Sequence, residues 1–85
     1  MKKPTKYPDK IITKYLEFIQ DFQDVYKIFN KSEENIGYLK YERVGRHTQW
    51  YLYQYTFMRI SSDCLKDILD IQKKLIDIRR KQDDN

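Results

Sequence analysis

Residues 8–30 read PDKIITKYLEFIQDFQDVYKIFN, and the expected architecture depends on how the apolar residues of this segment are spaced. They recur at steps of three or four residues, a pattern typical of one face of an α-helix; they are Ile11, Tyr15, Phe18, Phe22, Val25 and Phe29. Pro8 and Asp9 suit a first helical turn, since that turn needs no donor from Pro8 and its dipole favours a carboxylate. The segment therefore predicts a long N-terminal helix over residues 8–30.

The two ends of the chain differ from this segment in composition. Residues 1–7 carry Lys2, Lys3 and Lys6 and little apolar material, which predicts a flexible basic tail, and residues 82–85 form a short charged tail. Residues 8–81 are then expected to be a single domain. A chain of 85 residues buries only about 60 to 65% of its unfolded surface, so a partner subunit would add useful stability.

Residues 36–60 are rich in Tyr, Trp, Val, Thr and Phe, which favour strands. A polar break at Gly45, Arg46, His47 and Thr48 divides the segment, so it predicts a β-hairpin with strands near residues 38–44 and 49–60. A helix over residues 48–60 is the competing interpretation, because Trp50, Tyr53, Phe57 and Ile60 also fit helical spacing.

The last segment begins with Ser61, Ser62 and Asp63, residues that cap helix N-termini well. Basic residues gather at its other end, near Lys81, where the helix dipole favours them. The predicted fold class is therefore α+β, with a long N-terminal helix, a β-hairpin and a C-terminal helix (α-β-β-α). A lone hairpin is marginal in water and these helices have wide apolar faces, so we expect a homodimer.

The sequence offers little for catalysis. His47 and Cys64 are the single histidine and the single cysteine, and they are about seventeen residues apart. Asp63, Asp67 and Asp70 share a helix with interleaved lysines, as ordinary solvated helix pairs do. Two glycines cannot make a glycine-rich phosphate loop, and no zinc-ligand spacing occurs. We expect a non-enzymatic protein with no catalytic residues, metal site, cofactor or small-molecule substrate.

Two observations bear on the cellular location of the protein and on the genome that encodes it. No apolar run approaches the roughly 18 to 20 residues that cross a bilayer, and one cysteine makes no internal disulfide, so we expect a cytoplasmic protein without membrane contact. Ten Ile, twelve Lys and no Ala suggest AT-rich coding, as in a phage or other mobile element, and equally in an ordinary AT-rich cell.

The aromatic residues of the hairpin are its most distinctive feature. On a strand, alternation puts Tyr51, Tyr53, Tyr55, Phe57 and Arg59 on one face, while Trp50 and Leu52 begin the face that packs on the core. Such a tyrosine row suits stacking of single-stranded nucleic acid, a protein interface, or simple burial beneath the N-terminal helix.

Positive charge coincides with these aromatic residues. Lysines and arginines exceed carboxylates by four over residues 1–14 and by three over residues 37–60. The sequence therefore predicts a small nucleic-acid-binding accessory or regulatory protein, whose expected contacts are Lys2, Lys3, Lys6, Lys40, Arg43, Arg46 and Arg59 for the backbone and Tyr51, Tyr53, Tyr55 and Phe57 for stacking. The alternative is a protein-binding inhibitor or adaptor module that uses the aromatic hairpin face against a host protein or a second copy.

Overall fold

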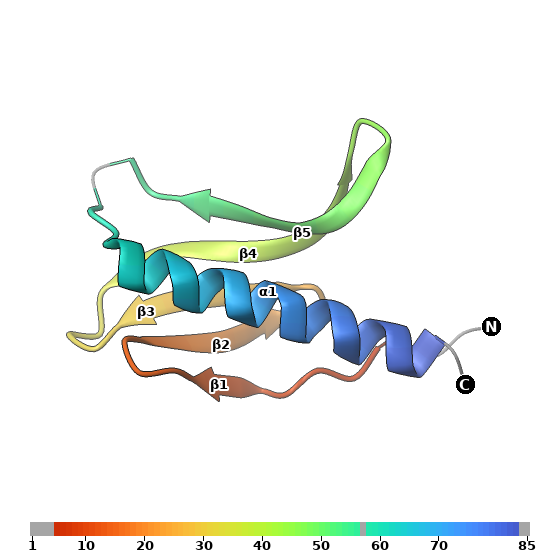
Figure 1. Cartoon of the computed structure of the whole chain (residues 1–85), viewed down its shortest axis with the longest axis horizontal. Helices are drawn as coiled ribbons and strands as arrows, with labels where there is room; N and C mark the ends of the chain where they lie inside the picture. Colours follow the sequence, from red (N-terminus) through yellow and green to blue (C-terminus); the bar gives the residue numbers. More distant parts are fainter. Residues whose placement is uncertain (1–4, 57, 84–85) are drawn as a thin grey trace.

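The computed structural model describes residues 5–56 and 58–83 (Figure 1). Within these residues an antiparallel sheet of five strands is followed by one helix, and each strand pairs with its neighbours in sequence. The elements are β1 (Lys10–Ile12), β2 (Leu16–Phe22), β3 (Val25–Asn30), β4 (Asn35–Val44), β5 (His47–Gln54) and α1 (Ser62–Asp83).

The predicted N-terminal helix is wrong, and with it the α-β-β-α order, because residues 8–30 contain β1, β2 and β3. The buried residues of this segment alternate, as strand residues do: Leu16 and Phe18, then Tyr26 and Ile28. Phe22, which the helical spacing placed on the core face, is 70% exposed. The segment is rich in β-branched and aromatic residues, so its apolar positions fitted both periods.

Short polar segments make the turns that divide these strands. Between β1 and β2, the Thr13 hydroxyl accepts a hydrogen bond from the Leu16 amide at 3.0 Å. Between β3 and β4, the Asn30 side chain accepts from the amides of Ser32 and Glu34 at 2.9 and 3.0 Å. Such local bonds offer the backbone an alternative to a continuing helix, and they fold the chain back into the next strand.

The predicted hairpin and C-terminal helix are confirmed. β4 pairs with β5 from Gly37 and Gln54 to Val44 and His47, and Gly45 adopts a φ of 62° in the turn between them. β5 ends at Gln54 instead of residue 60. The competing interpretation of a helix over residues 48–60 is wrong, because His47–Gln54 forms this strand. The Cys64 amide donates to the Ser61 hydroxyl at 3.3 Å, where the sequence predicted a cap.

The core lies between α1 and one face of the sheet (Figure 1). Ile68, Ile71 and Leu75 of α1 are buried against sheet residues that include Leu16, Phe18, Tyr26, Ile28, Leu39 and Trp50. Burying one such side chain contributes about 1.5 to 3 kcal/mol. The Gln72 side chain also donates to the Trp50 carbonyl at 2.9 Å, which ties α1 to the edge strand β5.

Residues 5–7, which the sequence assigned to the basic tail, lie against the rest of the fold. Tyr7 is buried and meets the Trp50 ring edge to face, with the ring centres 5.3 Å apart. The backbone of Lys6 exchanges two hydrogen bonds of 2.7 Å with the side chain of Gln82, near the end of α1. Lys2 and Lys3 lie outside the described residues.

A buried polar cluster joins this N-terminal segment to the sheet and α1. Burial raises the pKa of Tyr26 to about 12, and the nearby Tyr7 hydroxyl adds to the shift. Burial also raises the pKa of Tyr7, although Arg79 partly opposes it. Burial lowers the pKa of Arg79, but its bond to Tyr7, together with Tyr41 and Asp24, more than offsets this and keeps the group charged.

Candidate functional site

The face of the sheet opposite α1, here called the outer face, is not covered by any element of the described part of the chain. Four tyrosines gather where β4, β5 and the residues after β5 reach this face, and they form the tyrosine cluster: Tyr38, Tyr51, Tyr53 and Tyr55. Strand register brings three of them together, since Tyr38 pairs with Tyr53 and Lys40 with Tyr51. The predicted face alternation along β5 is therefore confirmed: Trp50 is buried and Tyr53 is 36% exposed.

The rings of the cluster are ordered by contacts with one another and with the backbone. Tyr38 and Tyr53 stack with their centres 4.8 Å apart and an interplanar angle of 12°. Tyr55 lies 6.5 Å from Tyr38 at an angle of 60°. The Tyr51 hydroxyl donates to the His47 carbonyl at 3.2 Å, so this ring points along β5 toward the hairpin turn. A pre-ordered aromatic surface loses little conformational entropy when it binds a partner.

Gly37 permits the close approach of β4 and β5 beside the cluster. A Cβ atom at this position would clash with the backbone carbonyl oxygen of Tyr53, and it would lie 3.2 Å from the Gln54 Cα. The neighbouring strand is also irregular, because the register between β3 and β4 shifts at Ile28 and Phe29. Glycine at position 37 therefore allows β4 and β5 to lie close together beneath the stacked rings of Tyr38 and Tyr53.

Positive and negative charges are balanced on the outer face. Three lysines form ion pairs there, and the pairs are Lys10 with Glu17 at 3.7 Å, Lys27 with Asp21 at 3.8 Å and Lys40 with Glu42 at 3.5 Å. The side chains of these pairs are 25 to 50% exposed, and such surface pairs contribute only about 0 to 1 kcal/mol each. The lysines can therefore exchange their partners for phosphate at small cost.

A shallow hollow of about 320 Å³ adjoins the cluster on this face. It combines aromatic rings with two ammonium groups and one carboxylate, and its lining residues are Asp21, Phe22, Val25, Lys27, Tyr38, Lys40 and Tyr55. Phe22 is 70% exposed at the end of β2, so its ring stands beside the hollow as accessible apolar surface. The hollow can accept a flat apolar group and place an anion near Lys27 or Lys40.

The structure brings together some of the predicted contact residues and separates others. Tyr51, Tyr53, Tyr55 and Lys40 share the outer face. Arg43 and Arg46 lie at the hairpin turn, where the Arg43 side chain donates to the Gly45 carbonyl at 3.0 Å. Lys6 lies beside Gln82 and so does not join the cluster, Arg59 is exposed in the segment between β5 and α1, and Phe57 lies outside the described residues.

Five residues of the site were not predicted as site residues: Asp21, Phe22, Val25, Lys27 and Tyr38. Phe22 and Lys27 fell within the expected N-terminal helix, so the prediction gave them no place on a sheet. The sequence signal for β3 was weak, because Val25, Tyr26, Ile28 and Phe29 are all apolar and do not alternate with polar residues. The absence of an N-terminal helix also contradicts the interpretation that such a helix buries the tyrosine row.

The described residues limit the other chemistry that this chain offers. Among residues 5–56 and 58–83, no three His, Cys, Asp or Glu side chains group closely enough to hold a metal ion. In the same part of the chain, no helix has the length and apolar character needed to cross a membrane. Comparisons with protein-family models, curated proteins and solved structures find no match to this chain.

Proposed function

We propose that the protein binds single-stranded nucleic acid on its outer face. The observation that carries this proposal is the tyrosine cluster, with the stacked Tyr38 and Tyr53 rings beside Lys27 and Lys40 on an uncovered sheet. Unpaired bases stack on aromatic rings at about 1 to 3 kcal/mol per base, while lysines meet the phosphates. A duplex hides its bases, so this face favours single strands.

The hairpin turn extends the same path toward positive charge. Arg46 lies in the hairpin turn beyond the cluster, and the outer face itself has balanced charge, so this arginine adds the attraction that the lysine pairs lack. The protein would act as a non-enzymatic accessory or regulatory protein. Its lone Cys64 is free, which fits the reducing cytoplasm that we propose as its location.

Substitution of Tyr53 tests the proposal. Tyr53→Ala should weaken binding of a fluorescently labelled single-stranded oligonucleotide about fivefold or more, measured by anisotropy, because one stacking surface is lost. Tyr15→Ala is the matched control, since Tyr15 is 37% exposed and Tyr53 36%, but Tyr15 lies outside the cluster at the β1–β2 turn. Equal losses in the two variants, or no binding by the wild-type protein at low salt, would contradict the proposal.

A protein partner on the same face is the second candidate. Exposed apolar side chains favour it, because Ile12 is 62% exposed, Phe22 70% and Ile19 37%. Tyrosine and phenylalanine are enriched in the cores of protein interfaces, and the balanced charge of the face suits such contacts as well. A homodimer that pairs two outer faces, or an inhibitor or adaptor bound to a host protein, would cover this surface.

The self-association form of this candidate has a direct test. Sedimentation equilibrium of the wild-type protein should show a dimer that Phe22→Ser weakens, if two outer faces pair. Leu69→Ser is the control, because Leu69 is 57% exposed on α1, away from the outer face. A monomer at all concentrations, with oligonucleotide binding intact, would leave nucleic acid as the partner of the face.

A further inference from the structure

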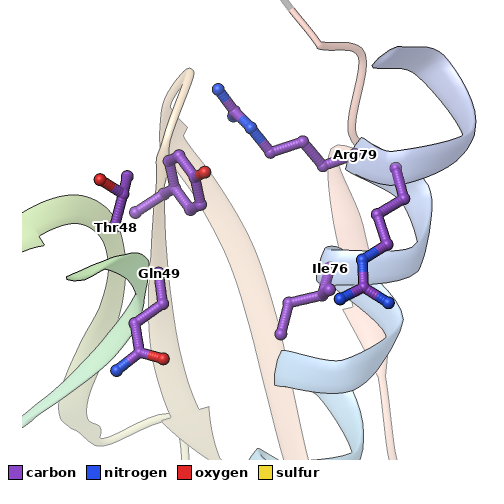
Figure 2. Close-up of a pocket in the computed structure, with 6 residues that line it drawn as sticks. Thr48, Gln49, Ile76 and Arg79 are labelled. Atoms are coloured by element: carbon purple, nitrogen blue, oxygen red, sulfur yellow. The ribbon is translucent and has the colours of Figure 1, made fainter. Parts of the chain in front are cut away.

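A second candidate site lies on the other side of β5. A cleft of about 290 Å³, here called the arginine cleft, separates the hairpin from the C-terminal half of α1. Figure 2 shows Thr48 and Gln49 on its strand side and Ile76 and Arg79 on its helix side. Tyr41 and Arg80 complete its lining, which contains no carboxylate.

Arg79 is held in place before any ligand arrives. Its guanidinium donates to the Tyr7 hydroxyl at 2.9 Å and lies over the Tyr41 ring, 3.9 Å from the ring centre. Asp24 lies 3.5 Å from the same nitrogen atom and balances part of the charge. Fixed geometry lowers the entropic cost of binding, and it leaves the remaining donors of the guanidinium for a ligand.

Arg80 adds a second positive charge to the cleft, beyond the Arg79 charge that Asp24 partly balances. It is exposed at the rim of the arginine cleft, and no hydrogen bond or ion pair joins it to another described residue. Arg43 stands near the same rim, because it is the register partner of the cleft residue Thr48. The cleft therefore combines guanidinium groups with the hydroxyl of Thr48 and the amide of Gln49, all of which can donate hydrogen bonds.

We propose that the arginine cleft binds a phosphate group. Planar guanidiniums match phosphate oxygens in pairs of hydrogen bonds, and neutral donors such as the Thr48 hydroxyl complete the oxygen contacts. The Tyr41 ring faces Arg79, so the cleft offers an anion site and no second platform for bases. The phosphate belongs either to the end of a nucleic-acid strand or to a free small molecule.

The position of Gln49 connects this site to the proposed function. Gln49 precedes Tyr51 by two residues on the edge strand β5, about 7 Å along the strand. Because β5 is an edge strand, a nucleic-acid strand whose bases stack on the tyrosine cluster can pass around this edge and place a terminal phosphate in the arginine cleft. The end of a nucleic-acid strand as the source of the phosphate rests on the proposed function, whereas the phosphate site itself does not.

Titration with inorganic phosphate tests the site. Amide NMR signals of Thr48, Gln49 and Arg80 should shift together as phosphate is added, and Arg80→Ala should weaken the apparent affinity about fivefold or more. Lys66→Ala is the matched control, because Lys66 is an exposed cation on the first turns of the same helix. Equal effects of both substitutions, or shifts spread over all cationic surfaces, would overturn the proposal.

Two oligonucleotides of one sequence, with and without a 5′-phosphate, separate the sources. Tighter binding of the phosphorylated strand, lost in Arg80→Ala, identifies a strand end as the ligand. Phosphate binding that depends on Arg80, with no preference between the strands, identifies a free phosphate compound. Oligonucleotide binding without any phosphate site contradicts this inference alone, and phosphate binding without oligonucleotide binding contradicts the proposed function alone.

Discussion

The guanidinium carbon of Arg79 lies 3.9 Å from the centre of the Tyr41 ring, and this contact joins α1 to the β4–β5 hairpin at one edge of the sheet. The same guanidinium bonds to the Tyr7 hydroxyl at 2.9 Å, so it also connects the N-terminal segment to both elements. The Lys6–Gln82 and Gln72–Trp50 hydrogen bonds each link two of these parts, whereas Arg79 contacts all three. Arg79 is therefore expected to contribute more to stability than an ordinary surface arginine.

Replacing Arg79 tests this role. Arg79→Ala should lower the free energy of unfolding by about 2 to 3 kcal/mol, because a cation–π contact and a charge-assisted hydrogen bond are lost. Arg79→Lys should recover only part of this, since an ammonium cannot stack and donate in the same geometry. Urea denaturation measures both. Arg80→Ala is the control and should change stability by less than about 0.5 kcal/mol; an equal loss in the control would contradict the assignment.

The raised pKa of Tyr26 predicts instability in alkali. The folded protein holds this pKa at about 12, above the ordinary value of 10.0, so folding favours the neutral phenol. Its contribution is complete below pH 10 and is lost as the pH rises toward 12. The whole shift of this pKa corresponds to about 2 to 3 kcal/mol in the free energy of unfolding. Urea denaturation at several pH values should show this decline, and Tyr26→Phe should reduce it; an unchanged pH dependence in the variant would contradict the linkage.

The two glycines should respond differently to the same substitution. Gly37→Ala places a Cβ against the Tyr53 carbonyl, so β4 and β5 must separate, at a cost of about 2 to 4 kcal/mol. Gly45→Ala meets no atom within 4 Å and strains only the left-handed turn conformation, at about 1 kcal/mol. Thermal unfolding of the pair measures the difference. A smaller effect at Gly37 would show that the strands separate easily beside the cluster.

Carboxylates on the outer face should oppose nucleic-acid binding. Asp21 pairs with Lys27 at 3.8 Å beside the hollow, so Asp21→Asn releases that lysine and removes a repulsive charge. Binding of a labelled single strand should tighten about two- to fourfold at moderate salt, and less at high salt because of screening. Asp70→Asn, on the exposed side of α1, changes the net charge equally and should have little effect. Equal tightening in both variants would point to net charge alone.

The hairpin and α1 could be predicted because their signals were local. Gly45 marked the turn and Ser61 and Asp63 marked the helix start, and the turn favoured the hairpin over the helix that residues 48–60 also fitted by spacing. Residues 8–30 lacked that property, because their dense apolar residues fitted both helical and strand spacing. Pairing of β1 with β2, β2 with β3 and β3 with β4 selects the strands, and the spacing of apolar residues along one strand does not contain this information.

The candidate site was predictable only where the hairpin was. Tyr51, Tyr53 and Lys40 were placed on one surface because alternation along a correctly predicted strand puts them there. Lys27 and Phe22 reach the same surface through β2 and β3, and Arg79 reaches Tyr41 through tertiary packing. Such contacts depend on strand order and helix placement, which short-range spacing does not encode.

NMR mapping of a bound single-stranded oligonucleotide would show directly whether the outer face binds nucleic acid. If the outer face binds the oligonucleotide, the largest amide shifts fall on Tyr38, Lys40, Tyr51 and Tyr53, and they shrink as salt rises, because phosphate contacts release counterions. Residues on the exposed side of α1, such as Lys66 and Asp70, should stay unchanged. Shifts that centre on α1, or no shifts at low salt, would contradict nucleic-acid binding by the outer face.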